Sequence, residues 1–186
     1  MNKVHILGFS GSLRQGSYNR ALLRAAQELL PEDVRLELFD LGPIPLYNGD
    51  VEARGFPEAV VAFKERIAAA DALLIAAPEY NYSMPGVLKN AIDWASRPPD
   101  ASPLNGKPVA LMGASVGLLG TARSQYHLRQ VCVFTNMLPL NRPEVFVGRA
   151  HEKFDAQGRL IDENTRKHVK GLLEAVRDWT RRLRCE

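Results

Sequence analysis

The feature that most constrains the fold is a repeated alternation of short apolar runs with longer amphipathic segments. Near-continuous apolar runs lie at residues 4–8, 72–78 (ALLIAAP) and 108–114 (PVALMGA). Such runs are typical of strands that are buried on both faces of a parallel sheet. Residues 34–39 alternate apolar and charged side chains, which predicts an edge strand, and a last strand is expected at 145–147.

Apolar residues recur at helical spacing between and after these runs. The predicted helices cover residues 19–30, 56–70, 85–94, 121–137 and 162–184. Strands that alternate with helices in this way favour an α/β fold with a doubly wound parallel sheet over a barrel, which needs eight such units. Periodicity does not decide the strand order. With 186 residues, 46% of them hydrophobic, we expect a single domain over residues 1–186.

Composition argues against several classes of protein. The formal net charge is +3, with both signs interspersed along most of the chain, so the charge alone does not indicate nucleic-acid binding. Cys132 and Cys185 lie far apart, and the four histidines share no spacing, so neither a disulfide framework nor a metal site is expected. No apolar run approaches the roughly 18 residues of a membrane span. We therefore expect a cytoplasmic protein with no membrane partner.

The loops after the strands are where a doubly wound sheet binds its ligands. The first, GFSGSLRQGSYN, offers hydroxyl or amide groups and one guanidinium at the start of a helix. These come from Ser10, Ser12, Arg14, Ser17 and Asn19. Together with the unpaired N–H groups of the helix they predict a phosphate site. The sequence matches neither the nucleoside triphosphate loop nor the dinucleotide-binding motif. The alternative is a turn that ends in an ordinary helix N-cap.

The second loop begins where the strand at 72–78 ends. Pro78, Glu79, Tyr80 and Asn81 present aromatic faces and hydrogen-bonding groups beyond the sheet, where a flat polar ring could pack. The alternative is a proline-rich surface turn whose tyrosines pack on the core.

The third loop, GASVGLLGTARSQ, follows the strand at 108–114. Its glycines, Gly117 among them, would let the backbone approach a ligand beside Ser115. By itself this loop is equally consistent with a flexible turn that ends in a Thr121 N-cap.

Taken together, GSLRQGSYN, PEYNYSMPGVLKNAIDW and GASVGLLGTARSQ resemble the NADPH-dependent FMN reductase family, and the resemblance spans nearly the whole chain. It implies a flavodoxin-like three-layer sandwich with a five-stranded parallel sheet in the order 2-1-3-4-5. FMN would sit at the switch point between the first and third strands, as it does in flavodoxin.

The resemblance also assigns roles to the loop residues. The FMN phosphate would be held by Ser10, Ser12, Arg14, Ser17 and Asn19, the isoalloxazine ring would be lined by Pro78, Glu79, Tyr80 and Asn81, and Ser115 with Gly117 would close the site. No side chain would be catalytic and no metal would be needed, because the cofactor carries the hydride chemistry.

The function expected on this basis is FMN-dependent oxidation of NAD(P)H with two-electron reduction of quinones. Chromate, free flavins and azo compounds are further expected acceptors, and a ping-pong mechanism is expected because one flavin face serves both substrates. An electron-carrier flavodoxin and a phosphate-binding sensor domain are the alternatives. A homodimer or homotetramer with Arg123, Tyr126 and Glu144 at the contact is expected from relatives, a solvated helix face being the alternative. The choice between NADH and NADPH stays open.

Overall fold

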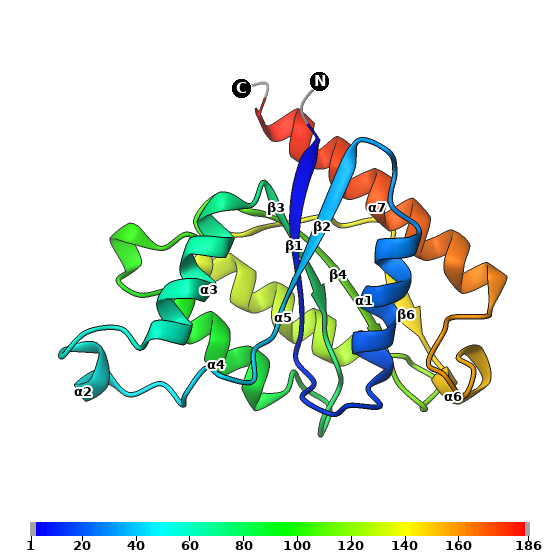
Figure 1. The fold of residues 1–186 in the computed structure, drawn as a ribbon, viewed down its shortest axis with the longest axis horizontal. Coiled ribbons are helices and arrows are strands. Elements are labelled where there is room, and N and C mark those ends of the chain that lie inside the picture. The colour runs from blue at the N-terminus through cyan, green and yellow to red at the C-terminus, as the bar shows by residue number, and fades with distance from the viewer. Residues whose placement is uncertain (1–2, 185–186) are drawn as a thin grey trace.

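A twisted parallel sheet forms the middle layer of the molecule (Figure 1). The structure is a computed structural model, and it describes residues 3–184. The strands are β1 (Val4–Ser10), β2 (Val34–Phe39), β3 (Ala72–Ala76), β4 (Pro108–Ala114), β5 (Leu138–Pro139) and β6 (Val145–Val147). Their order is β2-β1-β3-β4-β5, with β6 also paired to β4, and every pairing is parallel. The predicted order 2-1-3-4-5 is confirmed.

The fifth position of the sheet differs from the prediction of one strand at 145–147. It is shared by β5, which pairs with Pro108 and Val109, and β6, which pairs with residues 112–114. The chain leaves the ladder between them, where Pro143 has no N–H to donate to a neighbouring strand. The end of β4 is therefore held by β6, directly before the third loop begins.

Five long helices cover the sheet, close to the predicted segments. They are α1 (Tyr18–Glu28), α3 (Glu58–Ala69), α4 (Gly86–Ala95), α5 (Ala122–Thr135) and α7 (Glu163–Arg184). Three short elements were not predicted, namely α2 (Gly49–Glu52), η1 (Pro99–Ala101) and α6 (Ala150–Lys153). Each of these three elements is shorter than two turns and is therefore too short to give a periodic pattern of apolar residues. In the part of the chain that the structure describes, no helix is both long and apolar enough to span a membrane.

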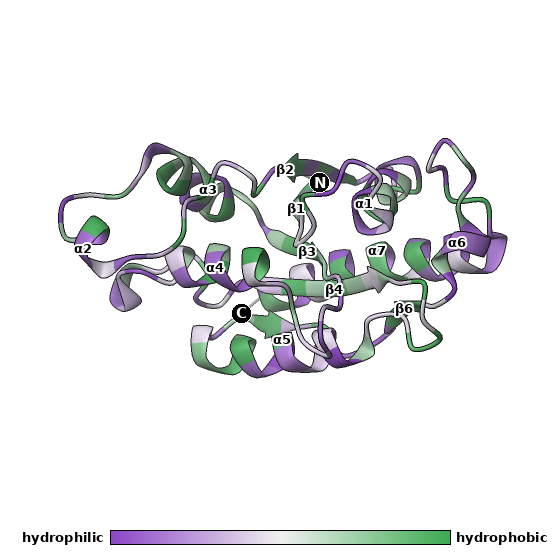
Figure 2. Ribbon diagram, turned by 90° about the horizontal axis from the view of Figure 1, so that it is seen from below, coloured by the Kyte–Doolittle hydropathy of each residue, from purple (hydrophilic) through white to green (hydrophobic). Residues whose placement is uncertain are grey.

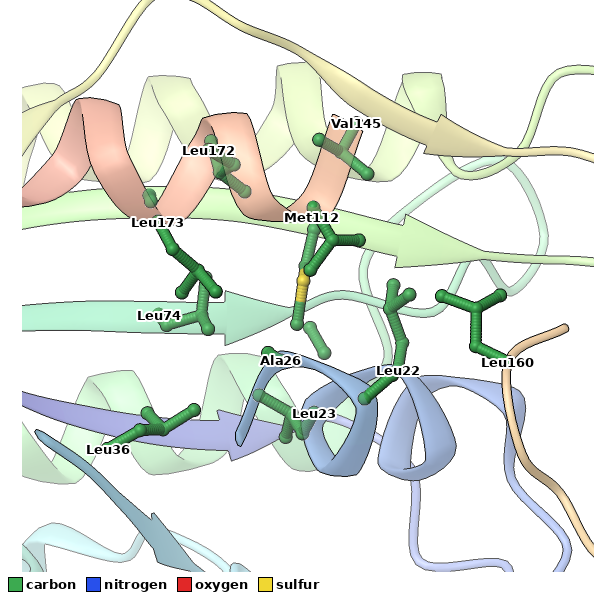
Figure 3. Close-up of a cluster of buried hydrophobic side chains, with 14 of the residues drawn as sticks. Leu22, Leu23, Ala26, Leu36, Leu74, Met112, Val145, Leu160, Leu172 and Leu173 are labelled. Atoms are coloured by element: carbon green, nitrogen blue, oxygen red, sulfur yellow. The ribbon is translucent and has the colours of Figure 1, made fainter. Parts of the chain in front are cut away.

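Two hydrophobic clusters show the three-layer arrangement. On one face, Leu22 and Leu23 of α1 and Leu172 of α7 pack around Met112 and Leu74 of the sheet (Figure 3). On the other face, side chains of α3, α4 and α5 pack against β1, β3 and β4. The strands β3 and β4 are mainly hydrophobic along their length, whereas the helices carry both kinds of residue (Figure 2). Because helices cover both faces of the sheet, ligands can reach it only at the two ends of its strands, which we call the amino edge and the carboxyl edge.

The carboxyl ends of β1, β3 and β4 reach the same edge, at the bottom of Figure 1. The loops that follow these three strands are those that carry the predicted site residues. The long segment after β2 is bound to α4 instead. Trp94 Nε1 donates to the carbonyl of Pro45 at 2.9 Å, and Asn90 donates to the same carbonyl and accepts from the Tyr47 N–H. The fold therefore brings the three predicted loops together.

Candidate functional site

A cavity of about 170 Å³ lies where the three loops meet. Its lining consists of Ser12, Arg14, Ser17, Tyr18, Asn19, Pro78, Glu79, Tyr80, Ala114, Ser115 and Val116. Most of the predicted residues are thus gathered in one place, while Ser10, Asn81 and Gly117 do not line it. Tyr18, Ala114 and Val116 were not predicted. Each lies next to a predicted residue in the chain, so adjacency was the only signal for them.

The first loop is held close to the second by Gly11. A Cβ on Gly11 would lie 2.9 Å from Leu88 Cβ and 3.2 Å from Pro78 Cδ, so a side chain here would push the two loops apart. The Ser10 hydroxyl accepts a hydrogen bond from the Ser12 N–H at 3.2 Å and so braces the turn from inside. The prediction that Ser10 lines the same site as Ser12 and Arg14 differs from this geometry, because Ser10 lines a neighbouring cavity and not this one.

The start of α1 supplies the groups that an anion requires. Ser17 is the N-cap, and its hydroxyl accepts from the Arg20 N–H at 3.3 Å. The first turn of α1 contains no acidic residue. Arg14 is exposed beside it and forms no ion pair within residues 3–184. A positive helix end with an unpaired guanidinium and hydroxyl groups is a suitable place for a phosphate.

Asn19 has a different geometry from the one that a phosphate donor would need. Its Nδ2 donates to the Ala114 carbonyl at 2.9 Å, and its Oδ1 accepts from the Ala114 N–H at 2.9 Å. The residue is only 4% exposed. Both ends of the amide are thus engaged by β4, and Asn19 fixes the distance between the first and third loops. Sequence alone could not show this, because the partner lies 95 positions away.

The second loop is attached to the start of α5. Glu79 accepts from the Arg123 N–H at 3.1 Å and pairs with the Arg123 guanidinium at 2.9 Å. Ser124 donates from its hydroxyl to the Pro78 carbonyl at 2.7 Å. The Glu79 carboxylate therefore caps a helix and does not stand free as a base. Its position next to proline and tyrosine gave no hint of this role.

The tip of the second loop is a tight exposed turn. Tyr80 and Ser83 exchange backbone hydrogen bonds at 3.0 Å, and between them Asn81 and Tyr82 have φ of 51° and 65°. Two consecutive non-glycine residues in the left-handed region are strained by about 1 kcal/mol or more each. Tyr82 stacks under Arg123, whose Cζ lies 3.7 Å from the ring centroid. The turn directs Asn81 away from the cavity and leaves Tyr80 on its rim.

The third loop closes the opposite side. Ser115 donates from its N–H to the Val147 carbonyl at 3.0 Å and from its hydroxyl to the Gly120 carbonyl. Gly120 has φ of +61°, and a Cβ there would lie 2.7 Å from the backbone of Phe146. By contrast, a Cβ on Gly117 would meet only the Ser115 hydroxyl at 3.7 Å. The backbone of the loop thus requires a glycine at position 120. The Gly117 carbonyl accepts from the Arg149 N–H, and the close approach of a ligand to Gly117 stays a prediction.

Cysteine chemistry has no place in this site. Cys132 is buried on α5, and burial raises the pKa of its thiol to about 11. Such a thiol is almost entirely protonated at neutral pH and is a poor nucleophile. Cys185, the other cysteine, lies outside the described residues.

Comparisons with known proteins agree with this geometry. A family model described as NADPH-dependent FMN reductase matches residues 4–152. An NAD(P)H-dependent FMN reductase of Pseudomonas aeruginosa is 59% identical over 181 residues, 97% of each chain. A quinone reductase of Escherichia coli K12 is 44% identical over 98% of each chain. Among solved structures, a flavoenzyme NAD(P)H:(acceptor) oxidoreductase from Paracoccus denitrificans superposes with a TM-score of 0.88 at 37% identity, covering 96% of this chain and 98% of its own.

Proposed function

The chain belongs to the NADPH-dependent FMN reductase family, and from that membership we propose that it reduces quinones with electrons from NAD(P)H through an FMN held in the three-loop cavity. It is an enzyme that depends on FMN and NAD(P)H. One observation supports this site most strongly. One end of the cavity has an unpaired guanidinium, hydroxyl groups and a helix N-terminus, and the other end has proline and tyrosine.

The residues present fit FMN. Ser12, Arg14 and Ser17 would hold its phosphate together with the N–H groups of α1, and no carboxylate in the first turn of that helix would repel it. Pro78 and Tyr80 would line the isoalloxazine ring. When bound, FMN accepts hydride and passes on two electrons.

The protein's own part is to bind and orient the reactants and to exclude water from them. Asn19 and Glu79 keep the three loops at a fixed separation through their bonds to β4 and α5. Tyr80 at 47% exposure and Val116 at 62% form an apolar rim around the opening. A planar apolar acceptor such as a quinone would cover that rim on binding, which supports quinones as the substrate class.

We propose further that the two substrates use the cavity in turn. Each reacting ring must lie within about 3.5 Å of the flavin, so both substrates would stack on the one flavin face that the Tyr80 rim leaves open. Initial rates against NADPH at several fixed quinone concentrations should therefore give parallel double-reciprocal lines. Intersecting lines, with substrate inhibition excluded, would require a ternary complex. Chromate, free flavins and azo compounds stay predicted acceptors, to be tested in the same assay.

The electron-carrier and sensor alternatives make a different prediction. An FMN-loaded carrier would keep its yellow colour when mixed with NADPH alone, and a sensor could not be loaded with FMN. The proposed enzyme should lose its colour with NADPH and regain it on addition of quinone. A yellow protein that does not respond to either nicotinamide would contradict the proposal.

Residues 1–186 are proposed to form a single FMN-binding domain, in a cytoplasmic homodimer or homotetramer. Tyr126 on α5 is 51% exposed and lies against Phe146, and Glu144 is exposed nearby, which leaves both free for a subunit contact. Arg123 would take part in the same subunit contact while it stays paired with Glu79. Light scattering at micromolar concentration should give a mass of at least two chains, and a monomer would contradict the assembly.

A further inference from the structure

A second cavity, of about 300 Å³, opens between the start of α1 and the end of β2. Ser12 lines both this cavity and the proposed FMN cavity, so the two share a wall. Ser10, which is not among the residues that line the FMN cavity, lines this one. The loop after β1 thus presents polar groups on two sides, and the proposed cofactor uses only one of them.

Two arginines give this cavity its charge. Arg20 and Arg24 stand one turn apart on α1, where side chains at positions i and i+4 share a face. Neither forms an ion pair in the described part of the chain. Two neighbouring guanidiniums without an ion-pair partner repel each other, and a phosphate dianion would bind both.

The remaining walls indicate more than a free anion. Asp40 follows β2 directly and lines the cavity, and its Oδ1 accepts from the Gly42 N–H at 3.1 Å. A carboxylate would repel a bare phosphate but accepts hydrogen bonds from sugar hydroxyls. Leu23, Leu38 and Phe39 add an apolar wall on which a base could lie. Guanidiniums, a carboxylate and an apolar wall together match a phosphorylated nucleoside.

We infer that this cavity binds the 2′-phosphoadenosine end of NADPH, with Arg20 and Arg24 on the 2′-phosphate and Asp40 on a ribose hydroxyl. The inference rests on the proposed function, because it requires a nicotinamide nucleotide to react in the adjoining FMN cavity. In dinucleotide-binding folds an acidic residue near this place contacts the ribose 2′-hydroxyl of NAD, whereas an arginine accommodates the 2′-phosphate of NADP. Here Arg20 and Arg24 would take the 2′-phosphate, which leaves the 3′-hydroxyl of the same ribose for Asp40. The consequence is a preference for NADPH over NADH, which the sequence left open.

The direct test is a binding measurement on the FMN-loaded protein that involves no turnover. Calorimetric titration with adenosine 2′,5′-bisphosphate should show tighter binding than titration with adenosine 5′-monophosphate. Arg20→Gln should weaken the bisphosphate by about 10-fold, and Arg20→Gln/Arg24→Gln by more, because each loses a charge-assisted contact. Arg35→Gln is the matched control, since Arg35 is exposed on β2, lies outside the cavity lining and carries the same charge. Its effect should stay within about 2-fold.

A kinetic measurement separates this inference from its alternatives. In Arg20→Gln the ratio of the KM for NADPH to the KM for NADH should rise about 10-fold relative to the wild type. Equal changes in both KM values, or equal binding of the two adenosine nucleotides, would overturn the inference while leaving the reductase activity intact. A loss of FMN affinity in Arg20→Gln as large as that in Arg14→Ala would assign these arginines to the cofactor instead. Failure of the wild type to oxidise either nicotinamide would count against the proposed function.

Discussion

The two edges of the sheet treat their charged residues in opposite ways. At the amino edge, the residues that precede the strands are paired. Asp33 before β2 binds Arg177 and Arg181 of α7, at 3.3 and 2.7 Å. Asp71 before β3 accepts from the His5 N–H at 2.8 Å and binds Arg184. These contacts dock the closing helix on the sheet.

At the carboxyl edge three arginines lack such partners, whereas Arg123 is paired with Glu79. Arg14, Arg20 and Arg24 form no ion pair in the described part of the chain, although all lie beside cavities. The carboxylate of Glu79 is already engaged by α5. Arginines therefore dock a helix on the sheet at one edge, and at the other edge we propose that they bind phosphate. Position relative to the strand ends distinguishes the two uses, and composition does not.

The largest effect is expected from adding a side chain at Gly113, where β4 packs closely against the loop after β3. A Cβ on Gly113 would lie 1.9 Å from Thr121 Oγ1 and 2.5 Å from the Ala77 carbonyl. Gly113→Ala must therefore move β4 away from the loop after β3. We expect the free energy of unfolding to fall by about 3 kcal/mol and FMN binding to be lost as well. Urea denaturation measures the former.

The matched control for that change is Gly171→Ala on α7, where a Cβ would meet nothing within 4 Å. This variant should gain about 0.5 to 1 kcal/mol, because alanine favours the helix interior. Equal behaviour of the two variants would show that β4 and the second loop are not in close contact.

The next largest effect tests the amino edge. The side chain of Asp71 is 17% exposed, and its removal leaves the His5 N–H and Arg184 without their partner. Asp71→Ala should cost about 2 to 3 kcal/mol of stability with no change in FMN affinity. Asp178→Ala is the control, since its pair with Arg177 is exposed and should matter by less than about 0.5 kcal/mol. A loss of FMN affinity in Asp71→Ala would mean that the two edges are not independent.

Much of this could be predicted from sequence because local signals were sufficient. The apolar runs, the alternating pattern and the helical periodicity gave five of the six described strands, all but β5, and all five long helices, and the three motifs lie together around one cavity. Local pattern could not show which polar atoms are already satisfied by distant partners. Asn19 and Glu79 were predicted to contact the cofactor, and their bonds to Ala114 and Arg123 depend on tertiary packing. The split fifth strand likewise depends on what β4 offers along its length.

The smallest effect concerns pH at the amino edge. The pKa of Asp33 is lowered: desolvation raises it, but hydrogen bonds from Arg181 and Arg177 and the charge of Arg177 outweigh that. A carboxyl with a lowered folded-state pKa contributes stability that is complete above its ordinary value near 3.8 and is lost as the pH falls through the folded value. The melting temperature of the wild type should therefore exceed that of Asp33→Asn at neutral pH, and the difference should shrink as the pH falls through the folded-state pKa of Asp33. A constant difference across this range would assign the effect to packing.

The central claim is that the unpaired charge at the carboxyl edge is there for the phosphate of FMN. The most direct measurement compares the affinities of the wild type and Arg14→Ala for FMN and for riboflavin, which has no phosphate. Arg14 is exposed, so its removal should leave the fold intact and weaken FMN by about 1 to 3 kcal/mol, with little change for riboflavin. Equal losses for the two flavins, or no loss for FMN, would contradict the claim.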